Sequence, residues 1–459
     1  MVSVRRPAFS VLCFALVAAV LLFSDKGRID GDAAARFQAL EAVVERGELT
    51  AERYSIVQPL LAIPLYLAGS GLASLRGVAP DDLAGRRETI RQVVGRFGKV
   101  VAFAVAAWLF AQLRRRYGFS DAEAGGATLL LLFGSLLIPH AVDFYAEPLW
   151  TLLCLVALGA LADEAGEPYE AAVRRRGLRR SLLVTCVALS VPLSPVLAPV
   201  LAGAGLAASL LSRPRRAAPF LLAAGGAAAG VALALAENAL RRGGPLDFGY
   251  AGEGFTTPLL HGLAGMLFSP ARGLLFYAPA LVLLPLAARR GGVRGADPLL
   301  TLGAVFTHLL VLAYAKWHAW HGATYWGPRF LLPASVLAVL ALAVVAKREG
   351  ARWGPAAKAG LVVLAAVSYA VYKSGAAIRM KRLLPCVLDR GGDYESCFWL
   401  WSQHPLASWL DLPGLRDLLT HRSTAVELGA LLLFALLVAA TRRGSASGYP
   451  PERPAAGAR

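Results

Sequence analysis

The sequence has few charged residues and no signature of nucleotide binding or of a cysteine-rich metal site. Only 17% of its 459 residues are Asp, Glu, Lys or Arg, whereas 57% are hydrophobic. A soluble protein of this length would need far more polar surface, so the composition indicates a polytopic membrane protein. A glycine-rich phosphate-binding loop is also missing. Any chemistry must therefore come from carboxylates, histidines and arginines.

Cysteine is scarce as well, with five residues in the chain. Cys13, Cys154 and Cys186 lie in apolar segments, where we expect them to be small core residues. Cys386 and Cys397 fall together in one predicted outer loop, where an oxidising compartment would permit a disulfide. The sequence leaves the state of this last pair open.

Acidic residues are outnumbered, with 30 Asp and Glu against 47 Lys and Arg and a formal net charge of +17. The basic residues cluster on every second connection between apolar segments, which is the positive-inside pattern of a membrane protein. This pattern places both termini in the cytosol and argues against a nucleic-acid partner. The clusters include residues 114–116, 213–216, 289–290, 347–348 and 442–443.

The apolar segments predict an all-α membrane protein, a polytopic bundle of about 12 transmembrane helices. The segment from Pro59 to Leu75 is expected to be re-entrant or surface-lying, because a full span there would reverse the sides of the later basic clusters. Prolines at 192, 195 and 199 predict two short helices that meet within the membrane. The predicted spans lie near residues 7–23, 97–113, 121–138, 147–162, 181–193, 195–211, 218–237, 273–288, 298–315, 330–346, 358–373 and 425–441.

This topology predicts one transmembrane unit over residues 1–441 and a disordered cytosolic tail over 442–459, which is rich in Pro, Gly and Ala. Within the unit, 24–96 form a first outer loop with juxtamembrane helices, and 374–424 form the last outer loop. An amphipathic run in the first outer loop carries Phe37, Leu40, Val43 and Val44 on one face, and Gly47 ends it.

The unusual polar residues gather in the predicted outer loops. Transfer from a phosphate leaving group requires a carboxylate that accepts a proton and cations that hold an anion. Asp30 and Asp32, on either side of Gly31, are the candidate carboxylates. The candidate cations are Arg272, Lys316 and Arg329. The candidate substrate-binding residues are Tyr54, Gln58, Asp143, Glu147, Glu253, His261, His318, His321 and Tyr325.

Structural alternatives stay open for several of these residues. Arg272 and Arg329 either hold a phosphate or extend to lipid headgroups. Glu147, directly before a proline, either belongs to the site or stabilises the N-terminus of a helix.

No metal or other cofactor is predicted. His318 and His321 lie three residues apart without a third nearby ligand. Asp30 and Asp32 together have the form of a metal-binding acidic pair, so a divalent cation there is an alternative that we do not favour.

Four stretches resemble the GT-C superfamily of integral membrane glycosyltransferases, which take sugars from polyprenyl-phosphate donors. Residues 31–66, from Gly31-Asp32 through Gln58-Pro59 to Tyr66, resemble the first outer loop of the superfamily. The sequence HAVDFYAEPL at 140–149 is similar to its second outer loop. Residues 252–279 and 317–333, the latter with WGPRFLLP, are similar to bacterial members of the dolichyl-phosphate-mannose mannosyltransferase-like group.

The resemblance implies an inverting glycosyltransferase at the outer face of a bacterial inner membrane. Asp32 matches the catalytic aspartate of the superfamily, and Arg272 or Arg329 would meet the donor phosphate. Ala33 stands where many relatives carry a second acid, which leaves Asp30 as a competitor. The implied partners are a polyprenyl-phosphate-linked sugar, an acceptor glycan, lipid or protein, and the lipid bilayer.

A polytopic transporter or lipid flippase is the alternative from another class, and a lipid-linked glycan polymerase or ligase is a third. Many spans and broken helices would suit a transporter. A transport site, however, needs ionisable residues near the middle of the membrane, and His308 is almost the only one within the predicted spans. The sequence therefore favours the transferase.

Overall fold

The computed structural model describes residues 6–23, 29–166, 173–212, 215–250, 252–289, 297–323, 325–378, 382–421 and 423–446. The regular elements of these residues are helices. The α-helices are α1 (Arg6–Phe23), α2 (Asp32–Arg46), α3 (Val57–Leu75), α4 (Leu83–Val94), α5 (Phe97–Tyr117), α6 (Asp121–Gly134), α7 (Leu137–Ala141), α8 (Glu147–Gly166), α9 (Val173–Leu193), α10 (Leu197–Leu211), α11 (Ala218–Arg242), α12 (Leu259–Phe268), α13 (Leu274–Tyr277), α14 (Leu283–Arg289), α15 (Pro298–Ala315), α16 (Leu332–Glu349), α17 (Pro355–Ala377), α18 (Leu383–Asp389), α19 (Tyr394–Phe398), α20 (Leu412–Thr420) and α21 (Ser423–Ala446).

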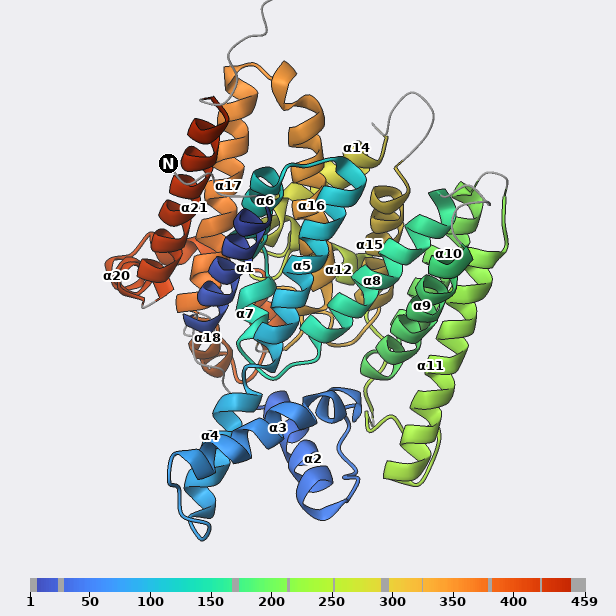
Figure 1. Cartoon of the computed structure of the whole chain (residues 1–459). Coiled ribbons are helices and arrows are strands. Elements are labelled where there is room, and N and C mark those ends of the chain that lie inside the picture. The colour runs from blue at the N-terminus through green and yellow to red at the C-terminus, as the bar shows by residue number, and fades with distance from the viewer. Residues whose placement is uncertain are drawn as a thin grey trace, which may run out of the picture.

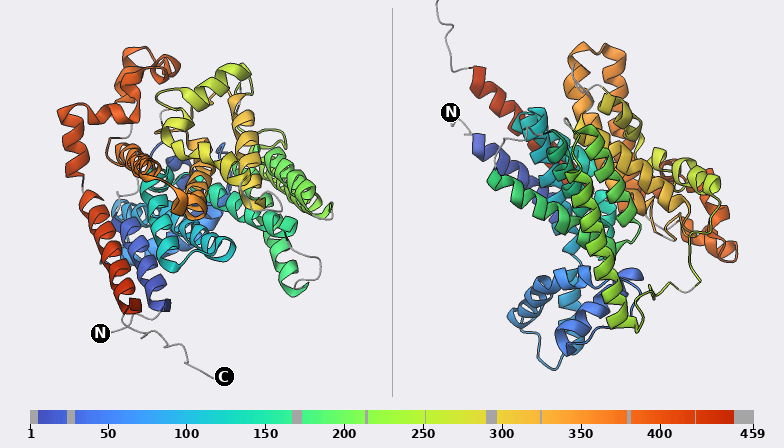
Figure 2. Two further views of the ribbon diagram at one scale, coloured as in Figure 1. Left: turned by 90° about the horizontal axis from the view of Figure 1, so that it is seen from above. Right: turned by 90° about the vertical axis from the view of Figure 1, so that its right-hand side faces the viewer.

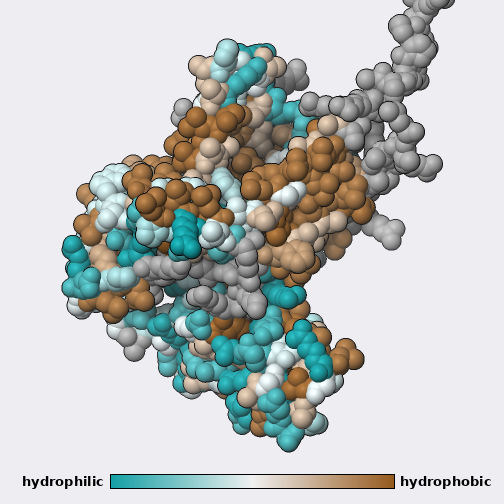
Figure 3. Space-filling model, turned by 90° about the vertical axis from the view of Figure 1, so that its left-hand side faces the viewer, coloured by the Kyte–Doolittle hydropathy of each residue, from teal (hydrophilic) through white to brown (hydrophobic). Residues whose placement is uncertain are grey.

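The long helices form one bundle, and α2, α3 and α4 make a separate layer beyond one end of it (Figure 1). The far end of α11 reaches this layer, as a second view shows (Figure 2). On the face drawn in Figure 3, hydrophobic side chains gather over the bundle, whereas hydrophilic ones predominate on the α2–α4 layer. A hydrophobic bundle with a polar layer at one end is the arrangement expected of a membrane protein with a site at the bilayer surface.

Seven helices in the described ranges are long and apolar enough to cross a membrane, or eight if the bent pair of α20 and α21 is one span. The polytopic, all-helical prediction is therefore confirmed, whereas the count of about 12 is not shown. Helices α1 and α10 occupy predicted spans but reach the length of only a short apolar helix in their described parts.

Helix α3 is long and apolar enough to be one of the seven, although the sequence predicts a re-entrant or surface-lying segment there. It packs mainly against α2 and α4, in the layer at the end of the bundle (Figure 1). The predicted tail needs a small correction, because α21 continues to Ala446. The rest of the tail, and residues 24–28 of the first predicted outer loop, lie outside the described residues.

The α2 helix is held in place by its apolar face. Phe37 and Leu40 are buried, as the amphipathic pattern predicts, in a cluster with Tyr66 of α3, Ile90 of α4 and Phe144. Burying a side chain such as Phe37 stabilises the fold by about 1.5–3 kcal/mol. The cluster thus fixes α2 against the start of α8, and it also fixes Asp32, the first residue of α2.

The cysteines behave as their contexts indicate. Cys386 and Cys397, whose state the sequence leaves open, form a disulfide that joins α18 to α19. Cys13, Cys154 and Cys186 are free and buried, which confirms their predicted role as core residues.

A buried ion pair inside the bundle corrects the expectation that His308 is almost the only ionisable residue within the spans. Lys373 of α17 donates to Glu427 of α21 at 3.0 Å, and both side chains are 1% exposed. The hydroxyls of Tyr369 and Tyr372 also donate to Glu427, at 2.9 and 2.8 Å. Each charge is satisfied by a partner on another helix, so neither apolar segment reveals the pair by itself.

Candidate active site

A cavity of about 730 Å³ lies where the α2–α4 layer meets the bundle. Its wall combines polar residues from loops that are distant in the sequence with an apolar part that includes Trp150, Leu193, Phe255 and Phe330. Seven of the sequence-predicted site residues line it: Asp32, Tyr54, Glu147, Glu253, His318, Tyr325 and Arg329.

Asp32 is the first residue of α2 and lies at the edge of this cavity. Gly31 before it has φ +53°, a left-handed conformation that glycine adopts without strain and that turns the chain into the helix. The Asp32 carboxylate accepts from Arg329 Nη1 at 3.1 Å, and its side chain is 24% exposed. Asp32 is therefore both ordered and accessible.

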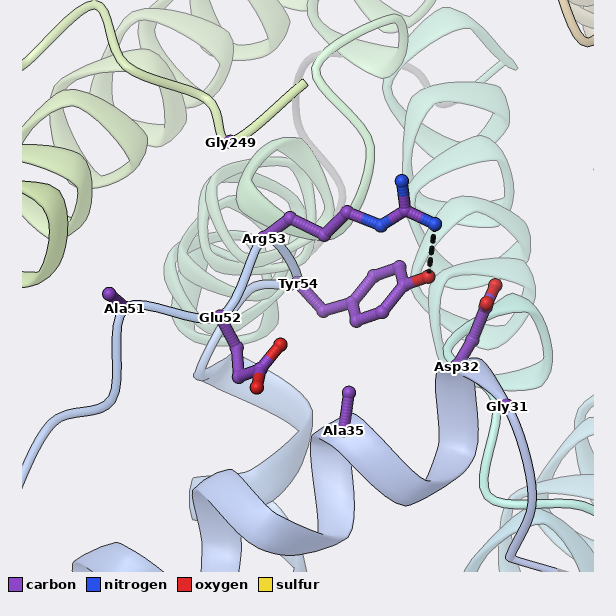
Figure 4. Close-up of a pocket in the computed structure, with 8 residues that line it drawn as sticks. All are labelled: Gly31, Asp32, Ala35, Ala51, Glu52, Arg53, Tyr54 and Gly249. Carbon is purple, nitrogen blue, oxygen red and sulfur yellow. Dashed lines mark hydrogen bonds between the residues drawn. The ribbon is translucent and has the colours of Figure 1, made fainter. Parts of the chain in front are cut away.

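The surroundings of Asp32 keep its carboxylate charged. Burial alone would raise its pKa, but the Arg329 charge, the Tyr54 hydroxyl and the Arg36 charge outweigh burial and hold the pKa below its ordinary value. The Tyr54 hydroxyl points toward the carboxylate in the close-up (Figure 4). Asp32 can thus accept a proton throughout the neutral range.

Arg329 lies between two carboxylates. Besides Asp32, its Nε atom lies 3.5 Å from Glu147 Oε1, at the start of α8. The guanidinium also lies near the rings of Tyr145 and Tyr325, with centroids 5.8 and 5.9 Å away. The other Glu147 oxygen, Oε2, is buried without a hydrogen-bond partner among the described residues, so it can accept from a ligand hydroxyl.

Two predicted substrate-binding residues support the cavity wall from behind instead of lining it. Asp143 accepts from the Tyr325 hydroxyl at 2.8 Å, and Gln58 donates to the Tyr145 carbonyl at 3.0 Å. Both side chains are buried. They orient the tyrosines that surround the Arg329 guanidinium.

A second set of polar contacts closes the cavity on another side. Arg53 donates to Glu253 at 3.1 Å and to the Tyr54 hydroxyl at 2.9 Å. Glu253 also lies 3.7 Å from His318 Nε2. These contacts join the segment before α3 to the loops that precede α12 and follow α15.

A second, more open cavity of about 570 Å³ adjoins the first (Figure 4). The two share part of their lining, because Gly31, Asp32, Arg53 and Tyr54 border both. The second cavity adds Ala35, Ala51, Glu52 and Gly249. Asp32 is therefore reachable from two sides.

Two predicted residues lie away from both cavities. Asp30 is exposed and lines neither. Arg272 is only 2% exposed, donates to the Ala323 carbonyl at 2.9 Å and packs on the Phe398 ring. It lines a separate space of about 30 Å³, and burial lowers its pKa to about 10. A space of this size suits a water molecule, not a phosphate group.

Three further predicted residues also lie outside the cavities. His261 pairs with Glu395, and Lys316 is half-buried. His321 is packed beside Phe398, and burial, with the Arg272 charge adding to it, lowers its pKa to about 3. His321 is thus neutral, and its Nδ1 accepts from the Ala323 amide at 3.0 Å. Among the residues that the structure places, no group of three or more His, Cys, Asp or Glu could hold a metal ion.

Sequence reasoning missed several cavity residues. Arg36 and Arg53 line the larger cavity, and their positions one helical turn after Asp32 and directly before Tyr54 were signals that could have found them. Ser194 and Tyr314, whose hydroxyls lie 2.6 Å apart, carried no such signal because they are 120 positions apart in the sequence.

Comparisons with known proteins support the fold. No protein-family model matches the chain, and no curated protein matches it. The structure is similar to that of ArnT from Cupriavidus metallidurans bound to undecaprenyl phosphate, with a TM-score of 0.53 and 15% identity over 97% of this chain and 81% of that one. It is also similar to the oligosaccharyltransferase AglB from Archaeoglobus fulgidus, in complex with an inhibitory peptide and a dolichol-phosphate. There the TM-score is 0.50, with 11% identity over 81% of this chain and 56% of AglB. The fold of this chain is therefore like the folds of ArnT and AglB.

Proposed function

We propose that this protein is a membrane glycosyltransferase that moves one sugar from a polyprenyl-phosphate carrier to an acceptor at the outer face of a bacterial inner membrane. The observation that carries the proposal is the position of Asp32, which borders two cavities and has Arg329 beside it. A transferase must bring two substrates to one base. The fold adds support, since both similar structures contain a polyprenyl or dolichol phosphate.

In this proposal Asp32 is the general base. The acceptor oxygen attacks the anomeric carbon, its proton passes to the Asp32 carboxylate, and the bond from that carbon to the phosphate oxygen breaks. The lipid phosphate leaves with the bonding electron pair. A single displacement of this kind inverts the anomeric carbon.

Arg329 is the proposed cation for the donor phosphate, ahead of Arg272 and Lys316, which lie outside the cavities. A guanidinium has five N–H donors, so Arg329 can keep a carboxylate partner while it binds phosphate oxygens. Glu147 holds the guanidinium from its other side. Developing charge on the leaving phosphate would then be stabilised by a preorganised group.

The larger cavity is the proposed site of the donor, because its apolar wall suits a polyprenyl chain and Arg329 lies within it. The smaller and more open cavity is the proposed acceptor site, and it carries the side chains of Glu52 and Arg53.

The buried pair of Lys373 and Glu427 bears on the transporter alternative, because a transport site needs ionisable residues within the membrane. Neither residue lines a described cavity, and each charge is satisfied by its partners. The pair therefore has the structural role of holding two helices together. The Asp32 site therefore favours transfer over transport, while a lipid-linked glycan polymerase or ligase would use the same chemistry.

The proposed function predicts a change in the glycans of the cell envelope. We expect mass spectrometry of cells with and without this protein to show one glycan, glycolipid or glycoprotein species that lacks a sugar residue in its absence. The same strain expressing the Asp32→Asn variant is the control, because that protein should insert without restoring the species. Unchanged glycans together with a mislocalised solute or lipid would favour the transporter.

The proposed orientation predicts the sides of two segments. A reporter fused after Gly444 should remain cytosolic, and one inserted near Gly391, in the predicted last outer loop, should lie outside. Protease accessibility in right-side-out vesicles would measure both. Cytosolic exposure near Gly391 would place the site on the wrong side of the membrane.

A further inference from the structure

The segment at residues 50–56, which carries Arg53 and Tyr54 into the site, is bound by the last turns of α11. Arg241 donates to the carbonyl oxygens of Thr50 at 2.7 Å, Glu52 at 3.0 Å and Tyr54 at 2.7 Å. Its side chain is fully buried. Residues 50–55 are not helical, and the Arg241 guanidinium satisfies three of their alternate carbonyls.

Glu237, one turn earlier in α11, binds the next part of the same segment. It pairs with Arg241 and accepts from Ser55 Oγ at 2.9 Å and from the Ile56 amide at 2.7 Å. Helix α3 begins directly afterwards at Val57. Both members of this ion pair therefore bind residues 50–56, which explains why two charges stay buried at this point.

The opposite side of the segment is packed against the loop that contains Gly249. This residue has φ +71°, and a Cβ atom there would lie 2.8 Å from Arg53 Cβ and 2.9 Å from Arg53 Cα. Only glycine fits this position without moving Arg53. The segment is thus held between α11 and the Gly249 loop.

The segment ends at the candidate base through a chain of polar contacts. Arg53 donates to the Tyr54 hydroxyl, and that hydroxyl points toward the Asp32 carboxylate (Figure 4) and lowers its pKa. Arg53 and Tyr54 also border both cavities. Movement of the segment would therefore change the environment of Asp32.

We propose that Glu237 and Arg241 form a clamp of positioning residues, which holds residues 50–56 so that Tyr54 orients the Asp32 carboxylate. The proposal rests on the proposed function for its effect on transfer. The clamp itself is a feature of the structure and is testable without an assay of transfer.

The kinetic test compares Glu237→Gln and Arg241→Gln with the wild type. We expect kcat to fall on the order of a hundredfold, as for a small misplacement of a catalytic group, while KM for the lipid-linked donor stays within about twofold. The acidic limb of the pH profile of kcat should move to higher pH, because displacing the Tyr54 hydroxyl removes a group that lowers the pKa of Asp32. Arg352→Gln, which removes an exposed pair with Glu349, is the control and should leave both parameters unchanged.

A double-mutant cycle distinguishes positioning from general loss of stability. In a Tyr54→Phe background, Glu237→Gln should add little, because both changes interrupt the same path. Fully additive losses, or an unmoved acidic limb, would overturn the proposal. Gly249→Ala, which crowds Arg53 and the Arg242 side chain but keeps Glu237 and Arg241, should reproduce the effect and covers the case in which the α11 variants fail to fold.

Limited trypsin digestion tests the clamp independently of activity. Cleavage after Arg53 should become faster in both α11 variants, whereas cleavage after Arg46, an exposed residue at the end of α2, should stay the same. Unchanged cleavage after Arg53 would overturn the clamp. Faster cleavage together with a wild type that transfers no sugar would instead overturn the proposed function and leave the clamp standing.

Discussion

Asp32→Asn is expected to nearly abolish sugar transfer while leaving membrane insertion and donor binding intact. Loss of a general base typically costs on the order of a hundredfold to ten-thousandfold in rate. Asp32 begins an ordered helix and borders both cavities, so its carboxylate is positioned to accept the acceptor proton. Single-turnover transfer from a synthetic polyprenyl-phosphate sugar, with donor binding measured separately, would check the result.

Asp30→Asn is the matched control, since this carboxylate is two residues away, exposed and outside both cavities. We expect it to cost much less. If the two aspartates held a divalent cation, both variants would fail and a chelator would inhibit the wild type. Full activity in Asp32→Asn with loss in Asp30→Asn would show that the other aspartate is the base.

Arg329→Met is expected to have the next largest effect, because it removes the charge shared by Asp32 and Glu147. Because this pair is only partly buried, its loss should cost less stability than the about 3–5 kcal/mol of a fully buried pair. Loss of a preorganised donor costs on the order of a hundredfold to a thousandfold in kcat. Donor affinity should weaken as well. Arg329→Lys keeps the charge but loses the planar fork, so its donor affinity should fall between those of Arg329→Met and the wild type.

The stability lost in Arg329→Met should depend on pH in a known direction. The pKa of Asp32 is depressed in the folded protein, so its contribution to stability is present above its unfolded value of about 3.9. That contribution is lost as the pH falls through the folded value. The stability difference between wild type and Arg329→Met in detergent should therefore narrow below about pH 4.

Arg272→Lys is the comparison for Arg329→Lys, because Arg272 is also a buried arginine near the site but lies outside both cavities. We expect it to weaken donor binding less. If Arg329→Lys and Arg329→Met both kept wild-type donor binding and kcat, Arg329 would not bind the donor phosphate. The alternative, a cation that extends to lipid headgroups, would then be favoured.

The sequence by itself determined those features that depend on neighbours along the chain. The apolar run at 298–315 is α15 with the same bounds (Pro298–Ala315), and Gly47 ends α2 in a left-handed conformation. The buried face of α2 was readable from the spacing of Phe37 and Leu40. Helix formation and burial of one face are local properties, because each depends on residues three or four positions apart.

Only the tertiary structure decided which polar residues act together. Asp32 and Arg329 are 297 positions apart, and no periodic pattern relates them. The same holds for Arg241, whose guanidinium binds the carbonyl oxygen of Thr50 191 positions away, and for the buried pair of Lys373 and Glu427. Resemblance could nominate Asp32, but it also nominated Arg272, which the packing places outside the cavity. An ion pair depends on distance in space and on shielding from solvent, and both are set by how the helices pack.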